Sequence, residues 1–397
     1  MTAYANGART ESIFDAARRA VAIEDLASKA GVKLMRAGRE LRGPCPICGA
    51  GSKSKSGPFA LRADKQTFRA YCGCDLRGDV VDLERALGGG SPLEAARRLV
   101  GGEYRSTPRP VRETRPEPQG PSVSDRVALE LWNGAHSSIR GTLAERYLRR
   151  RGIAAEVVAM VGERLRFHPR AKWGWDDEAR AWVTAPAMLA RVETDSGPTG
   201  GVHATYLTLE GLKAPLSPAK RMWGPQADAE GRPGGAWLIG PSGEGDLVTG
   251  EGIETTLAVV TLGLGKGLPL RACAALSLNR LQGGVERDEE GRIDPFNPKG
   301  DPTNPAFTWP APPDAPWSEV LVAVDRDMSA IRVKGRTARG RTCWFEFGAE
   351  QRARMCGRLA VAAWLAAGAP KARAIAPPPG SDFNDELRRV LALGCGA

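Results

Sequence analysis

Short apolar runs alternate with helical patterns along the C-terminal part of the chain. The runs have the length and the mainly apolar character of buried strands. They lie at residues 246–248, 272–276, 320–324 and 372–376. Residues 254–262 and 349–367 predict helices between them, and Gly368 ends the second helix. Strands that alternate with helices predict a parallel sheet covered on both faces.

The chain before residue 240 has a more mixed pattern. Helical periodicity appears at residues 11–30, 79–87, 91–100, 127–136 and 143–150. In the third of these helices, Ser91 is the expected N-cap and Pro92 the first helical residue. Short strands are expected at residues 165–168, 187–193 and 201–209, which predicts an α+β middle domain.

Two stretches that are poor in apolar residues divide the chain. Residues 103–124 are rich in Pro, Arg, Glu and Ser and predict a flexible linker. Residues 283–318 are rich in Gly, Pro, Asp and Asn and predict a surface insertion. We therefore expect a first domain at 1–102, the linker, a middle domain at 125–240 and a C-terminal domain at 241–392 that carries the insertion.

Composition favours an acidic partner. The 397 residues carry a formal net charge of +10, and nucleic acid is the commonest partner of such a chain. An arginine-rich composition also occurs without any acidic partner, so charge alone does not decide the question. No apolar run approaches the ~20 residues of a membrane span. Residues 1–9 contain no apolar signal core. We expect a cytoplasmic protein without a membrane partner.

Four of the eight cysteines form two close pairs. Cys45 and Cys48 are separated by two residues, and Cys72 and Cys74 follow about a hairpin's length later. Four thiolates at this spacing are typical of a closed tetrahedral zinc site, which is structural rather than catalytic. The alternative is four unrelated buried cysteines.

Carboxylates follow the predicted strands of the C-terminal domain. Glu251 follows the first strand, and Asp325 and Asp327 follow the third. A further cluster, Asp382 to Asp385, comes after the last strand. The carboxyl ends of parallel strands meet at one edge of a sheet, so these acids should gather there and repel one another unless a cation lies among them. The pattern predicts a site for a hard metal ion.

The cysteine segment contains Cys45-Pro46-x-Cys48, the strand Phe68-Arg69-Ala70-Tyr71, Cys74 and the stretch from Gly78 to Leu83. In these features it resembles the zinc-binding domain at the N-terminus of bacterial and phage DNA primases. The second pair of that family is usually CxxC, whereas this chain has CxC, so Cys72 departs from the family spacing. The resemblance implies contact with single-stranded template DNA. The candidate contacts are Lys53, Lys55, Arg62, Lys65, Arg69 and Arg77, with Phe68 and Tyr71 as stacking faces; the alternative for each is a solvated charge or a core aromatic.

The three acidic clusters, in this order and at strand ends, resemble the TOPRIM domain, the metal-binding Rossmann-like fold of DnaG-type primases, topoisomerases and some nucleases. The segment before them resembles the middle region of phage and plasmid primase-like proteins, on residues 144–152, 186–188 and 203–207. The fold class that follows is α/β, with an N-terminal zinc ribbon, an α+β middle domain and a C-terminal TOPRIM parallel sheet.

The resemblance also implies residue roles. Glu251, Asp325 and Asp327 would be catalytic and would hold Mg²⁺ or Mn²⁺, with Asp382 and Asp385 as further magnesium ligands. Glu254 and Asn384 are further candidates beside them, although a charge at a helix N-terminus explains Glu254 better. Asp385 also fits the N-cap of the last helix.

Basic residues supply the candidate contacts to DNA and nucleotides. Arg69 in the cysteine segment and Lys213, Lys220 and Arg221 in the middle domain are candidates for template or triphosphate binding. A basic stretch at 332–341 departs from the family pattern, in which a helix begins at once. It predicts either a nucleic-acid or triphosphate contact or a solvated loop.

The function implied is a DNA primase that makes short RNA primers from NTPs on single-stranded DNA for a phage, plasmid or integrated element. The sequence has no Gly-x-x-x-x-Gly-Lys-Ser/Thr phosphate loop, so a replicative helicase would be a separate chain. Two alternatives stay open: a metal-dependent nuclease that uses the same acids, and a non-catalytic module that binds DNA or recruits a helicase. A topoisomerase is disfavoured, because no separate domain clearly supplies a nucleophilic tyrosine.

Overall fold

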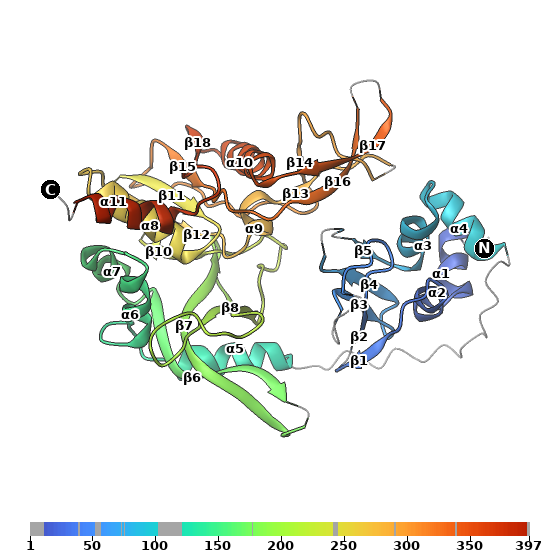
Figure 1. The fold of residues 1–397 in the computed structure, drawn as a ribbon, viewed down its shortest axis with the longest axis horizontal. Helices are drawn as coiled ribbons and strands as arrows, with labels where there is room; N and C mark the ends of the chain where they lie inside the picture. Colours follow the sequence, from blue (N-terminus) through green and yellow to red (C-terminus); the bar gives the residue numbers. More distant parts are fainter. Residues whose placement is uncertain are drawn as a thin grey trace, which may run out of the picture. The chain divides into compact units, whose positions relative to one another are not determined.

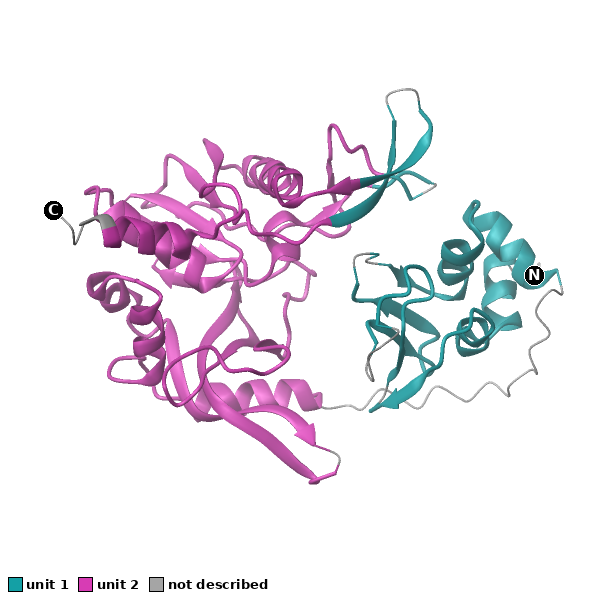
Figure 2. Ribbon diagram, viewed as in Figure 1, with its two compact units in different colours: residues 1–115, 287–292, 331–345 teal, residues 116–286, 293–330, 346–397 magenta. Residues whose placement is uncertain are grey.

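Two units divide the chain, and each has its own sheet and helices (Figure 2). Unit 1 comprises residues 1–115, 287–292 and 331–345, and unit 2 comprises 116–286, 293–330 and 346–397. The computed structural model describes residues 12–394 apart from 39, 52–56, 73, 75, 102–120, 177, 241–244, 290 and 338–339. Most of the linker predicted at 103–124 lies outside the described residues, as do the candidate contacts Lys53 and Lys55.

Unit 1 contains an antiparallel sheet in which the strands pair in chain order (Figure 1). Its strands are β1 (Met35–Ala37), β2 (Glu40–Gly43), β3 (Phe59–Arg62), β4 (Thr67–Ala70) and β5 (Arg77–Gly78). Its helices are α1 (Ile13–Ala20), α2 (Ile23–Lys29), α3 (Val80–Gly88) and α4 (Pro92–Val100). Ser91 caps α4 and Pro92 opens it, as predicted. Leu26, Phe59, Leu61 and Leu83 join sheet and helices in one core.

Unit 2 begins with a four-stranded antiparallel sheet, again paired in chain order. Its strands are β6 (Leu165–Asp176), β7 (Ala181–Thr194), β8 (Gly197–Tyr206) and β9 (Lys220–Trp223), and its helices are α5 (Val123–Asn133), α6 (Leu143–Arg150) and α7 (Ala155–Val161). Alternate residues of β7 face opposite sides. Leu189 packs with Leu131 of α5, whereas Met188 belongs to the core that lies between this sheet and the second sheet of unit 2.

The second sheet of unit 2 has the strand order β10, β12, β11, β15, β18. These strands are β10 (Ala236–Ile239), β12 (Leu270–Ala274), β11 (Asp246–Gly250), β15 (Val320–Ala323) and β18 (Ala372–Ile375). Only β10 is antiparallel to its neighbour; the other pairs are parallel. The helices are α8 (Ile253–Leu264), α9 (Leu278–Gln282), α10 (Ala349–Ala366) and α11 (Phe383–Gly394). The predicted alternation of strands and helices is confirmed.

Helices cover both faces of this second sheet (Figure 1). Val248 of β11 packs with Leu257 of α8 and Leu387 of α11 on one face. The preceding residue, Leu247, lies in the core of the other face with Trp364 of α10. Successive side chains of a strand point to opposite faces, so a strand covered on both sides needs mainly apolar residues on both faces. This explains why the runs are apolar without a period of two.

Three further segments complete the described fold. The predicted insertion at 283–318 contains only the short strands β13 (Gly284–Val285) and β14 (Gly300–Asp301), which pair with each other. β6 and β7 are much longer than the strands predicted at 165–168 and 187–193. Trp175 lies opposite Trp182 in the additional part, with ring centroids 5.8 Å apart. The basic stretch at 332–341 is not simply a loop. Its first half, residues 332–336, belongs to β16 (Ile331–Arg336), and the rest precedes β17 (Thr342–Phe347), which pairs with β16.

Within the described part of the chain, none of the helices combines the length and the apolar character needed to cross a bilayer.

Candidate functional site

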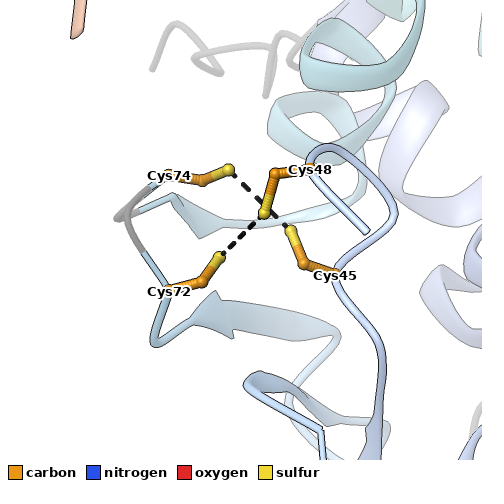
Figure 3. Close-up of side chains that lie close together, drawn as sticks. All are labelled: Cys45, Cys48, Cys72 and Cys74. Carbon is orange, nitrogen blue, oxygen red and sulfur yellow. Dashed lines mark hydrogen bonds between the residues drawn. The ribbon is translucent and has the colours of Figure 1, made fainter. Parts of the chain in front are cut away.

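The four predicted zinc ligands converge in unit 1 (Figure 3). Cys45 and Cys48 lie on the tight turn after β2, where Gly49 N–H donates to the Cys45 carbonyl at 2.9 Å. Cys72 and Cys74 follow β4. All four sulfur atoms lie within 4.8 Å of one another, with Sγ–Sγ distances of 3.9 Å from Cys45 to Cys74 and 3.5 Å from Cys48 to Cys72.

These distances fit a zinc ion. Four sulfurs at the ~2.3 Å Zn–S distance and tetrahedral angles lie about 3.8 Å apart. Burial raises the pKa of the Cys72 thiol to about 11 and raises that of Cys74 as well. Buried thiols that resist ionisation need a compensating cation to become thiolates, and Zn²⁺ supplies one. The donor set closes the coordination sphere, which is typical of a structural site. The CxC spacing therefore still places the sulfur atoms of both Cys72 and Cys74 among the four candidate zinc ligands.

The acids of unit 2 lie at one edge of the second sheet. Gly250 of β11 pairs with Ala323 of β15, and Ala323 pairs with Ile375 of β18, so the three strands end in register. Glu251 is the next residue after β11, and Asp325 comes two residues after β15. The chain after β18 returns to this edge, because Phe383 N–H donates to Asp325 Oδ1 at 3.1 Å. Tertiary structure therefore gathers the three acidic clusters where the sequence predicts.

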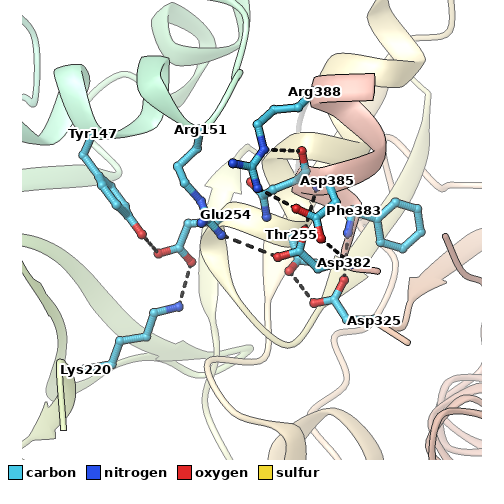
Figure 4. A network of polar contacts seen from close by, with 11 residues as sticks. Tyr147, Arg151, Lys220, Glu254, Thr255, Asp325, Asp382, Phe383, Asp385 and Arg388 are labelled. Atoms are coloured by element: carbon cyan, nitrogen blue, oxygen red, sulfur yellow. Dashed lines mark hydrogen bonds and ion pairs between the residues drawn. The ribbon is translucent and has the colours of Figure 1, made fainter. Parts of the chain in front are cut away.

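Asp325 is held from two sides (Figure 4). The Thr255 hydroxyl donates to Oδ2 at 2.7 Å, and Phe383 N–H donates to Oδ1. Burial raises the pKa of Asp325 to about 6; the two hydrogen bonds oppose this shift, and the charges of Asp382 and Asp327 add to it. Each oxygen of Asp325 keeps a further lone pair. An ionised Asp325 thus lies in a site that favours a cation.

Glu251 has the same electrostatic character. Burial raises its pKa, the positive charges of Lys220 and Arg352 oppose the shift, and Asp327 adds to it. A hydrogen bond from the backbone of Leu278, the first residue of α9, also lowers the pKa of the Glu251 carboxylate. Asp327 therefore acts electrostatically on both Glu251 and Asp325, as expected of acids around one cation.

Asp382 and Asp385 form a reciprocal cap at the start of α11. Asp382 Oδ1 accepts from Asp385 N–H at 2.7 Å, and Asp385 Oδ2 accepts from Asp382 N–H at 3.4 Å. Asp382 is therefore the N-cap, and Asp385 lies three residues later rather than at the cap. Arg388 binds Asp385 Oδ1 at 2.5 Å, whereas Arg151 lies 3.7 Å from Asp382 Oδ2. Of the two acids, Asp382 is the one that acts electrostatically on Asp325.

Glu254 belongs to a separate buried network (Figure 4). It is 3 % exposed and accepts hydrogen bonds from Tyr147 Oη and Lys220 Nζ, both at 2.8 Å. Burial would raise its pKa, but Lys220 and Tyr147 outweigh that effect and the pKa is lowered. Lys220 thus pairs with Glu254 while its charge also reaches Glu251. Tyr147 was missed from the sequence, since a tyrosine on an amphipathic helix gives no signal of a partner 107 residues away.

The remaining candidates lie elsewhere. Arg221 packs over the rings of Trp173 and Trp223. Lys213 is exposed, and its backbone forms an antiparallel β-bridge with that of Leu207. In unit 1, Arg69 stacks over exposed Tyr71. Phe68 is the other predicted stacking face. It is only 5 % exposed and packs against Phe59 in the core, so it is not available for stacking with a base. Asn384 is buried, and neither of its side-chain polar atoms has a partner in the described structure.

The two candidate metal sites differ in how complete they are. Among the described residues, the four cysteines are the one group in which three or more Cys, His, Asp or Glu ligand atoms lie within 4.8 Å of one another. The acids are more widely spaced. Mg²⁺ usually keeps several waters and takes one or two carboxylates plus substrate phosphates. The oxygen-only donors around Asp325, with their unbalanced negative charge, fit such an ion.

Comparisons with known proteins give limited matches. Residues 123–232 match a family model described as a domain of unknown function (DUF7146). No curated protein resembles the chain significantly in sequence.

Three solved structures resemble the chain at low similarity. The DnaG primase catalytic domain bound to ssDNA is 14 % identical, with 68 % of this chain and 79 % of that chain covered and a TM-score of 0.36. The primase fragment of the bacteriophage T7 primase-helicase protein is 14 % identical, with 87 % and 93 % covered and a TM-score of 0.31. The E. coli primase catalytic core is 13 % identical, with 67 % and 75 % covered and a TM-score of 0.32. These TM-scores are too low to carry an argument about function.

Proposed function

We propose that the chain is a primase-like nucleotidyltransferase that joins ribonucleotides into short primers on single-stranded DNA. The observation that carries the proposal is the position of Asp325. It lies half-buried just beyond the end of a parallel strand, is held by Thr255 and Phe383, and is acted on by the charges of Asp327 and Asp382. The TOPRIM-like order of the acidic clusters, behind a primase-like zinc segment, selects template-directed nucleotide transfer among the reactions such acids can support.

The reaction is a phosphoryl transfer. The 3′-hydroxyl oxygen of the primer or first nucleotide forms a bond to the α-phosphorus of an NTP, and the bond to the leaving pyrophosphate breaks. Mg²⁺ or Mn²⁺, when bound, supplies positive charge to the triphosphate and to the attacking and leaving oxygens. Asp325 and Asp327 would hold that ion, with Asp382 beside them.

Glu251 is the proposed acceptor of the 3′-hydroxyl proton. A general base works best when its pKa lies near the working pH. Burial raises the pKa of Glu251 above its ordinary value, which moves it in that direction. Glu251 as an additional metal ligand is the other role compatible with its place beside Asp327.

Primer synthesis on a single-stranded template tests the proposal. The full chain, loaded with zinc, is incubated with a labelled NTP, Mg²⁺ or Mn²⁺ and an oligonucleotide template. We expect short products from the wild type and none from Asp325→Ala. Asp314→Ala is the matched control, because Asp314 is an exposed aspartate in the segment before β15, away from its C-terminal end, and its loss should leave synthesis unchanged. Absence of product from the wild type, or unchanged product from Asp325→Ala, contradicts the proposal.

The same preparation separates synthesis from hydrolysis. End-labelled single-stranded DNA is incubated with metal but without NTPs. Cleavage that disappears in Asp325→Ala, together with no primer synthesis, would assign the acids to a nuclease.

A further inference from the structure

The β16–β17 hairpin carries an unusual excess of basic residues. Residues 331–347 contain five basic side chains and one acidic side chain, Glu346. Two of the basic side chains, Arg332 and Arg336, are exposed on β16, and Arg341 is exposed at the end of the turn. A solvated surface usually mixes both signs of charge, so a concentration of one sign indicates a polyanionic partner.

The cations of β16 lie on one face of the strand. Alternate residues point the same way, so Arg332, Lys334 and Arg336 share a face while Val333 and Gly335 between them are buried. Alternate residues of a strand are about 6.6–6.8 Å apart. The three cations therefore form a row along the strand that can follow the phosphates of a nucleic-acid backbone.

An exposed tryptophan lies beside this basic face. Trp344 of β17 is 52 % exposed, and the Arg332 guanidinium carbon lies 5.6 Å from its ring centroid. A large aromatic ring left half in water, next to cations, is the combination that stacks with an unpaired base while the cations contact the phosphates. A duplex hides the faces of its bases, so this combination favours a single strand.

The hairpin is also braced. Arg292 Nη1 donates to Thr342 Oγ1 at 3.1 Å, and Arg292 pairs with Asp288 at 2.8 Å. The turn is closed by Thr337 N–H to the Arg341 carbonyl and by Gly340 N–H to the Thr337 carbonyl, both at 2.8 Å. The charge of Arg336 acts on Asp288, which is paired with Arg292. These bonds hold the hairpin in shape.

From these observations we infer that the β16–β17 hairpin is a binding surface for single-stranded DNA. Arg332, Lys334 and Arg336 contact the phosphates, and Trp344 stacks on a base. The choice of single-stranded DNA as ligand rests on the proposed function. Binding is measured without NTPs and without Mg²⁺, so a failure to bind is distinguishable from a failure to polymerise.

Fluorescence anisotropy with two labelled oligonucleotides of equal length tests the stacking contact. One is oligo-dT, and the other has abasic sites in place of the bases, which keeps the phosphates and removes the stacking partners. Trp344→Ala should weaken binding of oligo-dT about tenfold and leave binding of the abasic strand nearly unchanged. Trp344→Phe should restore most of the loss, because the aromatic face returns.

Trp175→Ala is the matched control. Trp175 is also 52 % exposed on a two-stranded ribbon, but it lies next to the acidic residues Asp176 and Glu178. Its removal should change binding of neither oligonucleotide. Equal losses in Trp344→Ala and Trp175→Ala, or no loss in Trp344→Ala, would overturn the inference.

Salt dependence tests the phosphate contacts. The double variant Arg332→Gln, Arg336→Gln should flatten the slope of log K against log salt concentration by about 1.4, because each lost phosphate contact on a single strand contributes about 0.7. An unchanged slope contradicts the assignment. Both arginines are exposed, so circular dichroism and the melting temperature should match the wild type and show that the fold is retained.

Discussion

The hydroxyl of Thr255 donates a hydrogen bond of 2.7 Å to Asp325 Oδ2 and so joins two acidic clusters that are 70 residues apart in the chain. Thr255 lies in the first turn of α8, four residues after Glu251, and Asp325 lies two residues after β15. The bond orients the Asp325 carboxylate but only partly offsets the cost of burying its charge, since its pKa stays raised at about 6. The edge of the sheet is therefore built to hold a negative charge that lacks a full partner.

Asp325→Asn should stabilise the protein when no divalent metal is present. Above pH 6, Asp325 is ionised in a site that disfavours its charge, and two units of pKa correspond to about 3 kcal/mol, so we expect a gain of roughly 1–3 kcal/mol. An asparagine keeps an acceptor for Phe383 N–H. Denaturant unfolding at pH 8 measures the gain, and the same variant should lose any Mg²⁺-dependent rise in melting temperature. A loss of stability in metal-free buffer would contradict the conclusion that the charge of Asp325 destabilises the folded protein.

Mg²⁺ affinity should fall as the pH drops through about 6. The folded-state pKa of Asp325 is raised, so its carboxylate takes up a proton at a higher pH than an ordinary aspartate and then cannot bind the metal. Isothermal titration with Mg²⁺ from pH 5 to pH 8 checks this. In Asp325→Asn the fall in Mg²⁺ affinity near pH 6 should be absent. If the fall persists, another group must be the one that takes up the proton.

Asp382 offers a way to separate a capping role from a metal-binding role. Asp382→Ser keeps an N-cap side chain for Asp385 N–H but removes the carboxylate, whereas Asp382→Ala removes both. Asp382→Ala should lose about 1 kcal/mol of stability, and Asp382→Ser only a few tenths. Both should weaken Mg²⁺ binding to the same extent. Normal Mg²⁺ affinity in Asp382→Ser would show that Asp382 only caps α11 and does not bind the metal.

Glu254 should matter for stability through its two partners. Glu254→Ala leaves Lys220 Nζ and the buried Tyr147 hydroxyl without their acceptor, so we expect a loss of about 2–4 kcal/mol. Glu254→Gln keeps an acceptor oxygen and should lose less. Because the pKa of Glu254 is lowered, its contribution is present at neutral pH and disappears only at strongly acidic pH. Urea unfolding of both variants at pH 7 provides the measurement, and equal losses in the two would exclude the hydrogen-bonding role.

Zinc content should depend on Cys45 and not on Cys343. Cys45→Ser removes a buried ligand from the four-sulfur group and should release the metal and loosen unit 1. Cys343→Ser is the control, because Cys343 is exposed on β17 and lies outside the group. Metal analysis of the purified variants gives the outcome. Full zinc occupancy in Cys45→Ser would contradict the predicted site.

Local patterns in the sequence determined much of the site. The CxxC and CxC spacings brought four sulfurs together, because a tight turn and a hairpin leave little freedom to the residues that flank them. Apolar runs followed by Glu251 and Asp325 predicted strands whose ends carry the acids, because a strand covered on both faces is mainly apolar until it leaves the sheet. The parallel order of the strands then fixed a common edge.

Only the tertiary structure decided which polar groups meet. The pairing of Glu254 with Tyr147, the hold of Thr255 on Asp325 and the length of the tryptophan-bearing strands β6 and β7 depend on contacts between residues far apart in the chain. Periodicity reports which side of an element is apolar, but not which distant side chain lies against it. The partners of a buried charge come from packing, and so the difference between Asp325, which lacks a full partner, and Glu254, which has two, became visible only in the folded chain.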